Sequence, residues 1–127
     1  MNNNKVFVYG TLKKGNSVRG LNMFRDRGVE YVSDAVTTEA DFSLYDLGAF
    51  PAVTSPGNNR ISGEVWEVDE NMMKVLDDIE GYPEFYNRME IKTTQGKAWM
   101  YYITDIKSFR TNYIEPDHNN IASWRNK

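Results

Sequence analysis

The chain contains no cysteine and one histidine, His118, among its 127 residues. The lack of cysteine excludes disulfide bonds, thiol nucleophiles, iron–sulfur clusters and thiolate zinc sites. A single imidazole also excludes a zinc site built from histidines alone. Basic residues are not in excess, since 15 Lys and Arg against 18 Asp and Glu give a net charge of −3. Such a chain offers no basic field to a phosphate backbone, and we expect no nucleic-acid partner.

Long apolar runs are missing as well. Nowhere do about 18 apolar residues follow one another, and residues 1–5 are polar, without the apolar segment of a signal peptide. These features predict no membrane partner and a cytoplasmic location. With 40% hydrophobic and 26% charged residues and no repeat or linker, the sequence predicts a single domain over 1–127. We expect its core to cover about 5–105, followed by a polar tail over 106–127.

Hydrophobic patterning predicts several strands. Short runs rich in β-branched and aromatic residues favour strands, and breaks containing Gly, Pro and Asn favour turns. The expected strands cover 5–9, 29–38, 42–47, 61–68, 87–93 and 97–103, with turns at 48–51, 55–59 and 94–96. The apolar character of 5–9 predicts a strand buried on both faces, and 61–68 is not a simple half-buried strand either.

Two helices are expected beside these strands. One covers 17–25. The other follows the N-cap residue Asp69 and ends at Gly81, and its apolar face carries Met72, Val75, Leu76 and Ile79. Together the elements predict an α+β domain. The tail is expected to pack locally through Tyr113, Ile114, Ile121 and Trp124.

Glu80 is the first candidate for chemistry, because it lies in the last turn of the second expected helix. The helix dipole disfavours an anion there by about 0.3 to 1 kcal/mol. Its neighbours one turn earlier are Leu76 and Asp77, an apolar residue and another acid. These surroundings would raise the pKa of Glu80 towards the range of a general acid or base. A solvated helix end is the alternative.

The second candidate is the loop Tyr9-Gly10-Thr11-Leu12 after the first expected strand. A buried strand that ends in glycine and turns sharply leaves successive backbone N–H groups able to hold an anion or an oxyanion. An ordinary strand-to-helix turn is the alternative. Residues 10–17, GTLKKGNS, also approach the phosphate-binding pattern G-x-x-x-x-G-K-[ST]. Asn16 stands where that pattern needs lysine, which disfavours nucleotide hydrolysis.

A metal site is not predicted. Asp77, Asp78 and Glu80 form an acidic group, but Asp78 projects away from the other two on a helix, and no further ligand is indicated. An acidic solvated face is the favoured interpretation. His118 lies in the polar tail and is expected at the surface.

Four segments in this order resemble the gamma-glutamyl cyclotransferase-like superfamily. They are VFVYGTLKKG at 6–15, LYDLGAFPAV at 44–53, SGEVWEV at 62–68 and LDDIEGYPEFYNR at 76–88. The sequence is most similar to the small gamma-glutamylamine cyclotransferase branch, which includes the plant avirulence-induced proteins. The resemblance extends from about residue 5 to residue 103, and it implies a small mixed β-barrel with flanking helices.

The resemblance also implies an enzyme. Members let the α-amine of a gamma-glutamyl amide attack its own γ-carbonyl, which releases 5-oxoproline and a free amine. The residues carried over are Tyr9, Gly10, Thr11 and Leu12 as the substrate-binding loop, Glu80 as the catalytic acid/base and Tyr86 as a residue lining the pocket, with Arg88 in support. A single carboxyl can move both protons, so no cofactor is expected.

A second hypothesis is a non-catalytic protein that sequesters a small ligand in the same cavity. A carboxyl at a helix end argues against it, although inheritance from an enzyme could leave one there. In either case we expect a small-molecule partner, and a net charge of −3 is compatible with a monomer or a homodimer.

Overall fold

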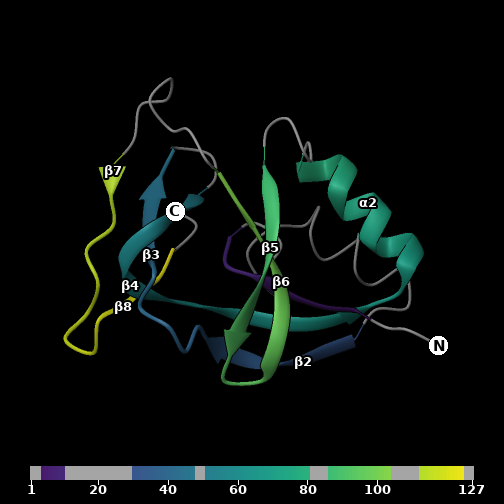
Figure 1. Cartoon of the computed structure of the whole chain (residues 1–127), viewed down its shortest axis with the longest axis horizontal. Helices are drawn as coiled ribbons and strands as arrows, with labels where there is room; N and C mark the ends of the chain where they lie inside the picture. Colours follow the sequence, from purple (N-terminus) through teal and green to yellow (C-terminus); the bar gives the residue numbers. More distant parts are fainter. Residues whose placement is uncertain (1–3, 11–29, 48–50, 81–85, 104–111, 125–127) are drawn as a thin grey trace.

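The computed structural model describes residues 4–10, 30–47, 51–80, 86–103 and 112–124, without the side chains of residues 79 and 80 (Figure 1). The elements are β1 (Asn4–Val8), β2 (Glu30–Val36), β3 (Phe42–Asp46), β4 (Pro51–Val68), α2 (Glu70–Glu80), β5 (Asn87–Thr93), β6 (Gly96–Tyr102), β7 (Asn112–Tyr113) and β8 (Ile121–Ala122). The predicted α+β class is confirmed. The helix predicted over 17–25 lies outside the described residues.

Strand β4 is the centre of the sheet. It pairs antiparallel with β1, β2 and β3 and parallel with β8. The hydrogen-bonded path runs β5-β6-β1-β4-β3-β7, with β2 and β8 also on β4. Because β1 runs parallel to β6, the sheet is mixed, as predicted.

The sheet does not close into the β-barrel that the resemblance implied. Among the described residues, no ladder joins β2 to β5; an isolated bridge between Thr37, just after β2, and Thr93 connects them, with a few hydrogen bonds beside it. One of the backbone hydrogen bonds beside it joins Thr38 N to Lys92 O at 3.0 Å. A barrel requires the closing strands to pair along a staggered ladder, and a single bridge does not provide one. The fold is an open mixed sheet with α2 against one face (Figure 1).

The turn predicted at 55–59 is wrong, because β4 continues through it. The ladder with β3 pairs Ser43 with Thr54 and Phe42 with Asn59, so the intervening residues of β4 bulge out of register. Bulges accommodate extra residues while the strand continues on both sides. The turn-forming residues thus produce a bulge within one long strand rather than a turn between two strands.

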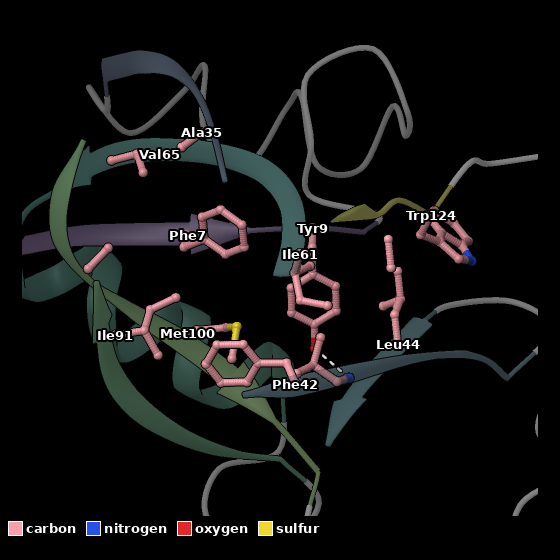
Figure 2. Packing of buried hydrophobic residues seen from close by; sticks show 13 residues of the cluster. Phe7, Tyr9, Ala35, Phe42, Leu44, Ile61, Val65, Ile91, Met100 and Trp124 are labelled. Atoms are coloured by element: carbon pink, nitrogen blue, oxygen red, sulfur yellow. Dashed lines mark hydrogen bonds between the residues drawn. The ribbon is translucent and has the colours of Figure 1, made fainter. Parts of the chain in front are cut away.

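Strand β1 is buried on both faces, as predicted. Val6 and Val8 belong to one apolar cluster, while Phe7 and Tyr9 belong to a second (Figure 2). This alternation follows from the two-residue period of a strand. The end of β1 is therefore held from both sides of the sheet where the candidate loop begins.

Helix α2 covers the first cluster, and its predicted start is confirmed. Asp69 Oδ1 accepts a hydrogen bond from Met72 N at 2.7 Å, the geometry of an N-cap. Met72, Met73 and Leu76 are buried in the cluster, and the helix ends at Glu80, directly before Gly81. In the part of the chain that is described, no helix has the length and apolar content needed to cross a membrane.

The β5–β6 hairpin is also confirmed. Thr93 pairs with Gly96 across the turn, and Gly96 has a φ of 92°, a left-handed conformation that glycine adopts without strain. The hairpin places Arg88 on β5 directly opposite Tyr101 on β6.

The tail contributes to the second cluster. Strand β8 pairs with β4, Ala122 is fully buried, and Trp124 is 3% exposed (Figure 2). Ile114 packs against the same cluster, whereas Tyr113 is 44% exposed. Of the predicted packing residues, Trp124 is therefore in the core and Ile114 packs against it, whereas Ile121 is partly exposed and Tyr113 is exposed.

The cap of α2 provides a test of the fold. Asp69→Ala removes the acceptor for Met72 N and should lower the free energy of unfolding by about 1 kcal/mol, measured by urea denaturation. Asp69→Asn is the matched control, because its side-chain oxygen still caps the helix, and it should lose much less. Equal losses in the two variants would contradict the role of the cap.

Candidate functional site

The predicted substrate loop begins in close contact with β4. Gly10 follows Tyr9 at the end of β1, and a Cβ on Gly10 would lie 2.6 Å from Pro51 Cγ and 2.7 Å from Pro51 Cδ. Only glycine permits this approach without displacing the proline ring. Thr11 and Leu12, the other predicted loop residues, lie outside the described residues.

The first loop residue, Tyr9, is buried and bonded to the backbone of two strands. Its hydroxyl donates to Tyr101 O at 2.8 Å and accepts from Val53 N at 3.3 Å. The phenol thus connects the end of β1 to β6 and β4. This geometry fixes the position from which the loop departs. Direct contact between Tyr9 and a substrate stays a prediction.

Tyr86, the predicted pocket residue, is also buried and lies just before β5. Its hydroxyl donates to Pro51 O at 2.7 Å. Gly10 and Tyr86 are far apart in the sequence, yet both contact Pro51. The structure therefore brings these two predicted site residues together at the first residue of β4.

Glu80, the predicted catalytic residue, is the last residue of α2, in the position that the helix prediction gave it. Its side chain is not among the described ones, so the predicted rise of its pKa stays a prediction. Leu76, one turn earlier, is fully buried in the cluster that contains Tyr86. Their shared cluster places α2 on the same side of the sheet as Tyr86.

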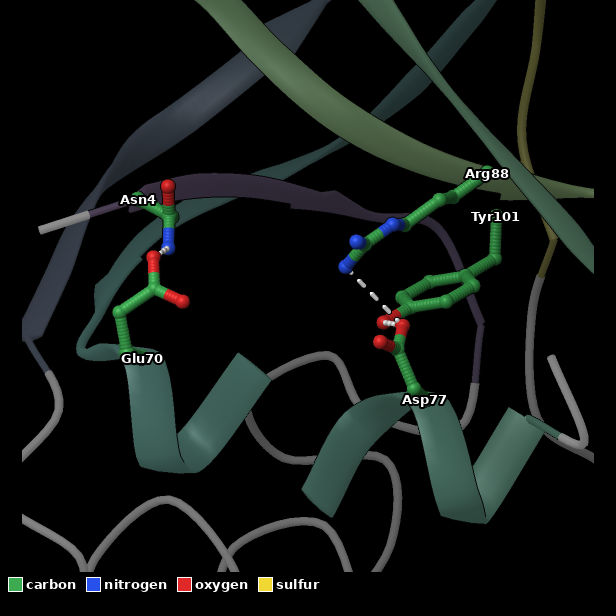
Figure 3. Close-up of polar contacts among 5 residues, drawn as sticks. All are labelled: Asn4, Glu70, Asp77, Arg88 and Tyr101. Carbon is green, nitrogen blue, oxygen red and sulfur yellow. Dashed lines mark hydrogen bonds and ion pairs between the residues drawn. The ribbon is translucent and has the colours of Figure 1, made fainter. Parts of the chain in front are cut away.

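Asp77 corrects the prediction of an acidic solvated face. Its Oδ1 accepts hydrogen bonds from the Tyr101 hydroxyl at 2.6 Å and from Arg88 Nη1 at 3.1 Å (Figure 3). The Arg88 guanidinium also lies over the Trp99 ring, 5.1 Å from its centroid. Asp78 is exposed, as predicted. Among the described residues, no three acidic or histidine side chains are grouped as metal ligands.

The spacing of Asp77 from Met73 could have indicated that Asp77 faces the protein. Asp77 follows Met73 by four residues, and Met73 is buried, so position 77 lies on the side of the helix that faces the protein. A carboxylate on that side requires donors. The predicted apolar face carried Met72, Val75, Leu76 and Ile79, without Met73.

A buried carboxylate, that of Glu64 on β4, was not predicted to be functional. It is 8% exposed and accepts a hydrogen bond from Trp66 Nε1 at 3.1 Å. It also pairs across the ladder with Val8, two residues before Gly10. Its place in an apolar strand gives no sequence signal that separates a functional acid from a structural one.

Two groups have shifted pKa values, Tyr31 and Asp117. The hydrogen bond from the Tyr31 hydroxyl to Asp34 raises the pKa of Tyr31 to about 12. The backbone N–H groups of Ile121 and Asn119 donate to Asp117 and lower the pKa of its carboxyl. Both shifts belong to local hydrogen bonds at strand and turn positions.

Comparison with known proteins gives consistent matches. The sequence profile of the family described as "Gamma-glutamyl cyclotransferase, AIG2-like" matches residues 6–125. A Vibrio cholerae protein provisionally named a gamma-glutamylcyclotransferase is 38% identical over 96 residues, which are 76% of this chain and 78% of the relative. The gamma-glutamylamine cyclotransferase of Rattus norvegicus is 34% identical over 96 residues, 68% of this chain and 61% of the relative.

A solved structure agrees with these sequence matches. The crystal structure of an AIG2-like protein from Mus musculus superposes with a TM-score of 0.74 at 25% identity, covering 100% of this chain and 99% of that one. The resemblance inferred from the four sequence segments is thereby confirmed.

The contact between Gly10 and Pro51 can be tested by a double-mutant cycle. Gly10→Ala should lower the free energy of unfolding by about 1 to 3 kcal/mol, because the added methyl group overlaps the proline ring. In a Pro51→Ala background the overlapping Cγ and Cδ are gone, so the same change should be markedly less destabilising. Urea denaturation of the four proteins measures the difference. An identical loss in both backgrounds would contradict the contact.

Proposed function

Since the chain belongs to the gamma-glutamyl cyclotransferase, AIG2-like family, we propose that it cleaves a gamma-glutamyl amide by internal cyclisation. The substrate's α-amine attacks its γ-carbonyl carbon and forms a new C–N bond. The tetrahedral intermediate then loses the amine of the original amide. The products are 5-oxoproline and the free amine, and no water, oxidant or reductant is consumed.

The observation that carries the proposal is the meeting of Gly10 and Tyr86 at Pro51. A Cβ on Gly10 would overlap the Pro51 ring, and the Tyr86 hydroxyl donates to Pro51 O. Gly10, at the start of the loop, and Tyr86, six residues after α2, therefore meet at one residue of β4. A substrate bound by the loop would lie on the side of the sheet where α2 ends with Glu80.

Glu80 is the proposed acid/base. The α-ammonium of the substrate must lose a proton before its nitrogen can attack, and the departing amine must gain one. One carboxyl beside both nitrogens can accept the first proton and return it to the second. The negative end of the helix dipole would favour the protonated form of such a carboxyl and bring its pKa closer to neutrality.

The loop would supply binding and charge stabilisation. Backbone N–H groups that follow Gly10 would donate to the γ-carbonyl oxygen as it becomes an oxyanion. Because the attack is intramolecular, a bound conformation that holds the amine near the carbonyl can provide about 7 to 11 kcal/mol of the barrier. Tyr9 and Tyr86 would keep the walls of the site in place through their hydrogen bonds to backbone.

A gamma-glutamylamine is the proposed substrate class. The four segments resemble that branch, and the relative from Rattus norvegicus, at 34% identity, bears that activity in its name. In this class the leaving group is the amine of a side chain or of a small molecule, such as lysine in an isopeptide linkage.

Replacing the proposed acid/base provides the first activity test. Glu80→Gln should lower kcat by about 10²- to 10⁴-fold, since the amide cannot transfer the protons, and should leave the unfolding midpoint nearly unchanged. Formation of 5-oxoproline measures the rate. Asp78→Asn is the matched control, an exposed acid on the same turn, and should retain activity. Turnover by Glu80→Gln close to that of the unmodified protein would end the assignment.

A substrate panel tests the reaction and its specificity. The protein is incubated with gamma-glutamyl-ε-lysine, other gamma-glutamyl amines and gamma-glutamyl α-amino acids, and the products are followed by mass spectrometry. We expect 5-oxoproline, formed fastest from the gamma-glutamyl amines. Faster turnover of the α-amino acid derivatives would refute the substrate class but retain the cyclisation. A ligand that binds and is recovered unchanged would instead support the sequestering protein.

A further inference from the structure

We propose that Tyr101 is a positioning residue that fixes the end of α2 relative to the substrate loop, through Asp77 and Tyr9. The inference deepens the proposed function and rests on it, because the end of α2 carries Glu80. Tyr101 itself is not proposed to touch the substrate.

The two ends of Tyr101 contact the two candidate elements of the site. Its carbonyl oxygen accepts the hydroxyl of Tyr9, the first loop residue, at 2.8 Å. Its own hydroxyl donates to Asp77 Oδ1 on α2 at 2.6 Å (Figure 3). One residue of β6 therefore links the start of the loop to the last turns of the helix.

The position of Tyr101 is itself well defined. The residue is 3% exposed and lies in the interior strand β6, between β5 and β1. A buried aromatic side chain in a paired strand has little freedom to change rotamer. Movement of Asp77 away from the sheet would leave the phenol hydroxyl in need of a new acceptor.

Arg88 reinforces the contact from the neighbouring strand. It lies opposite Tyr101 in the β5–β6 ladder, and its Nη1 donates to the same Asp77 oxygen at 3.1 Å. The side chains of Arg88 and Asp77 are 23% and 20% exposed, so this ion pair is partly shielded from water. Partial burial and a second donor make the interaction stronger than an exposed pair. The Trp99 ring below the guanidinium restricts Arg88 further.

The consequence for Glu80 follows from helix geometry. Asp77 precedes Glu80 by three residues, a little less than one turn of 3.6 residues. The last turn of a helix has carbonyl groups without helical partners and tends to fray. An anchor at Asp77 opposes fraying at the turn that carries Glu80. Because Tyr101 also holds Tyr9, the same anchor fixes the separation between that turn and the loop.

Tyr101→Phe tests the inference, with Tyr102→Phe as the matched control. The first change removes the hydroxyl that reaches Asp77 and keeps the ring and the backbone carbonyl. The second removes a hydroxyl from the next residue of the same strand, which contacts the second cluster. Steady-state kinetics and amide hydrogen exchange at residues 78–80 are measured for both variants and for the unmodified protein.

The expected result combines the two measurements. In Tyr101→Phe, kcat should fall by about 10- to 100-fold with KM changed less than about threefold, because the proton-transfer group is displaced while binding by the loop persists. Exchange at residues 78–80 should become at least about tenfold faster. Tyr102→Phe should match the unmodified protein in both measurements. Asp77→Asn should lie between the two, because its amide oxygen can still accept the Tyr101 hydroxyl.

Failure of the inference and failure of the proposed function are distinguishable. If the unmodified protein turns over no gamma-glutamyl compound, the proposed function is wrong, and the assignment of Tyr101 as a positioning residue for it is overturned too, whatever the exchange rates. If the unmodified protein is active, the inference alone is overturned by unchanged kcat in Tyr101→Phe, by unchanged exchange, or by equal effects in Tyr102→Phe.

Discussion

The arrangement of the candidate site depends on β4, which pairs with four other strands over its 18 residues. Its first residue, Pro51, contacts both Gly10 and Tyr86, and its last, Val68, leads through Asp69 into α2. One continuous strand therefore helps to position Gly10, Tyr86 and the start of α2. Strand β4 bulges between Thr54 and Asn59, but its pairing with strands on both sides of that bulge holds its two ends relative to each other.

Tyrosine hydroxyls provide the polar connections around this strand. Those of Tyr9, Tyr86 and Tyr101 each donate to a backbone carbonyl or a carboxylate of another element. In the described residues, every buried side-chain nitrogen and oxygen has a hydrogen-bond partner. Such satisfied networks favour one packing over alternatives, because a shifted arrangement would leave a buried polar atom unpaired. Large aromatic rings with a single polar tip suit this purpose, since one residue fills the core and also joins two segments.

Local patterns predicted the elements well, but not the contacts between distant parts of the chain. The cap at Asp69 and the glycine at 96 each act through neighbouring residues, so α2 and the β5–β6 hairpin could be predicted. The bulge between Thr54 and Asn59 depends on pairing with β3, and the failure of the sheet to close depends on how β2 meets β5. The partners of Asp77 likewise come from two other strands, which no spacing along the helix reveals.

The placement of an acid at the end of a helix becomes understandable from these contacts. General acid–base catalysis requires hydrogen-bond distances of about 2.6 to 3.2 Å between the carboxyl and the group with which it exchanges a proton. A frayed helix end would let Glu80 move out of this range. The same end offers the electrostatic environment that favours a protonated carboxyl. The chain combines the two by anchoring Asp77, one turn earlier, to strands that also hold the start of the loop. Under the proposed function, the sheet would thus position Glu80 through Asp77, while the end of the helix would favour the protonated form of its carboxyl.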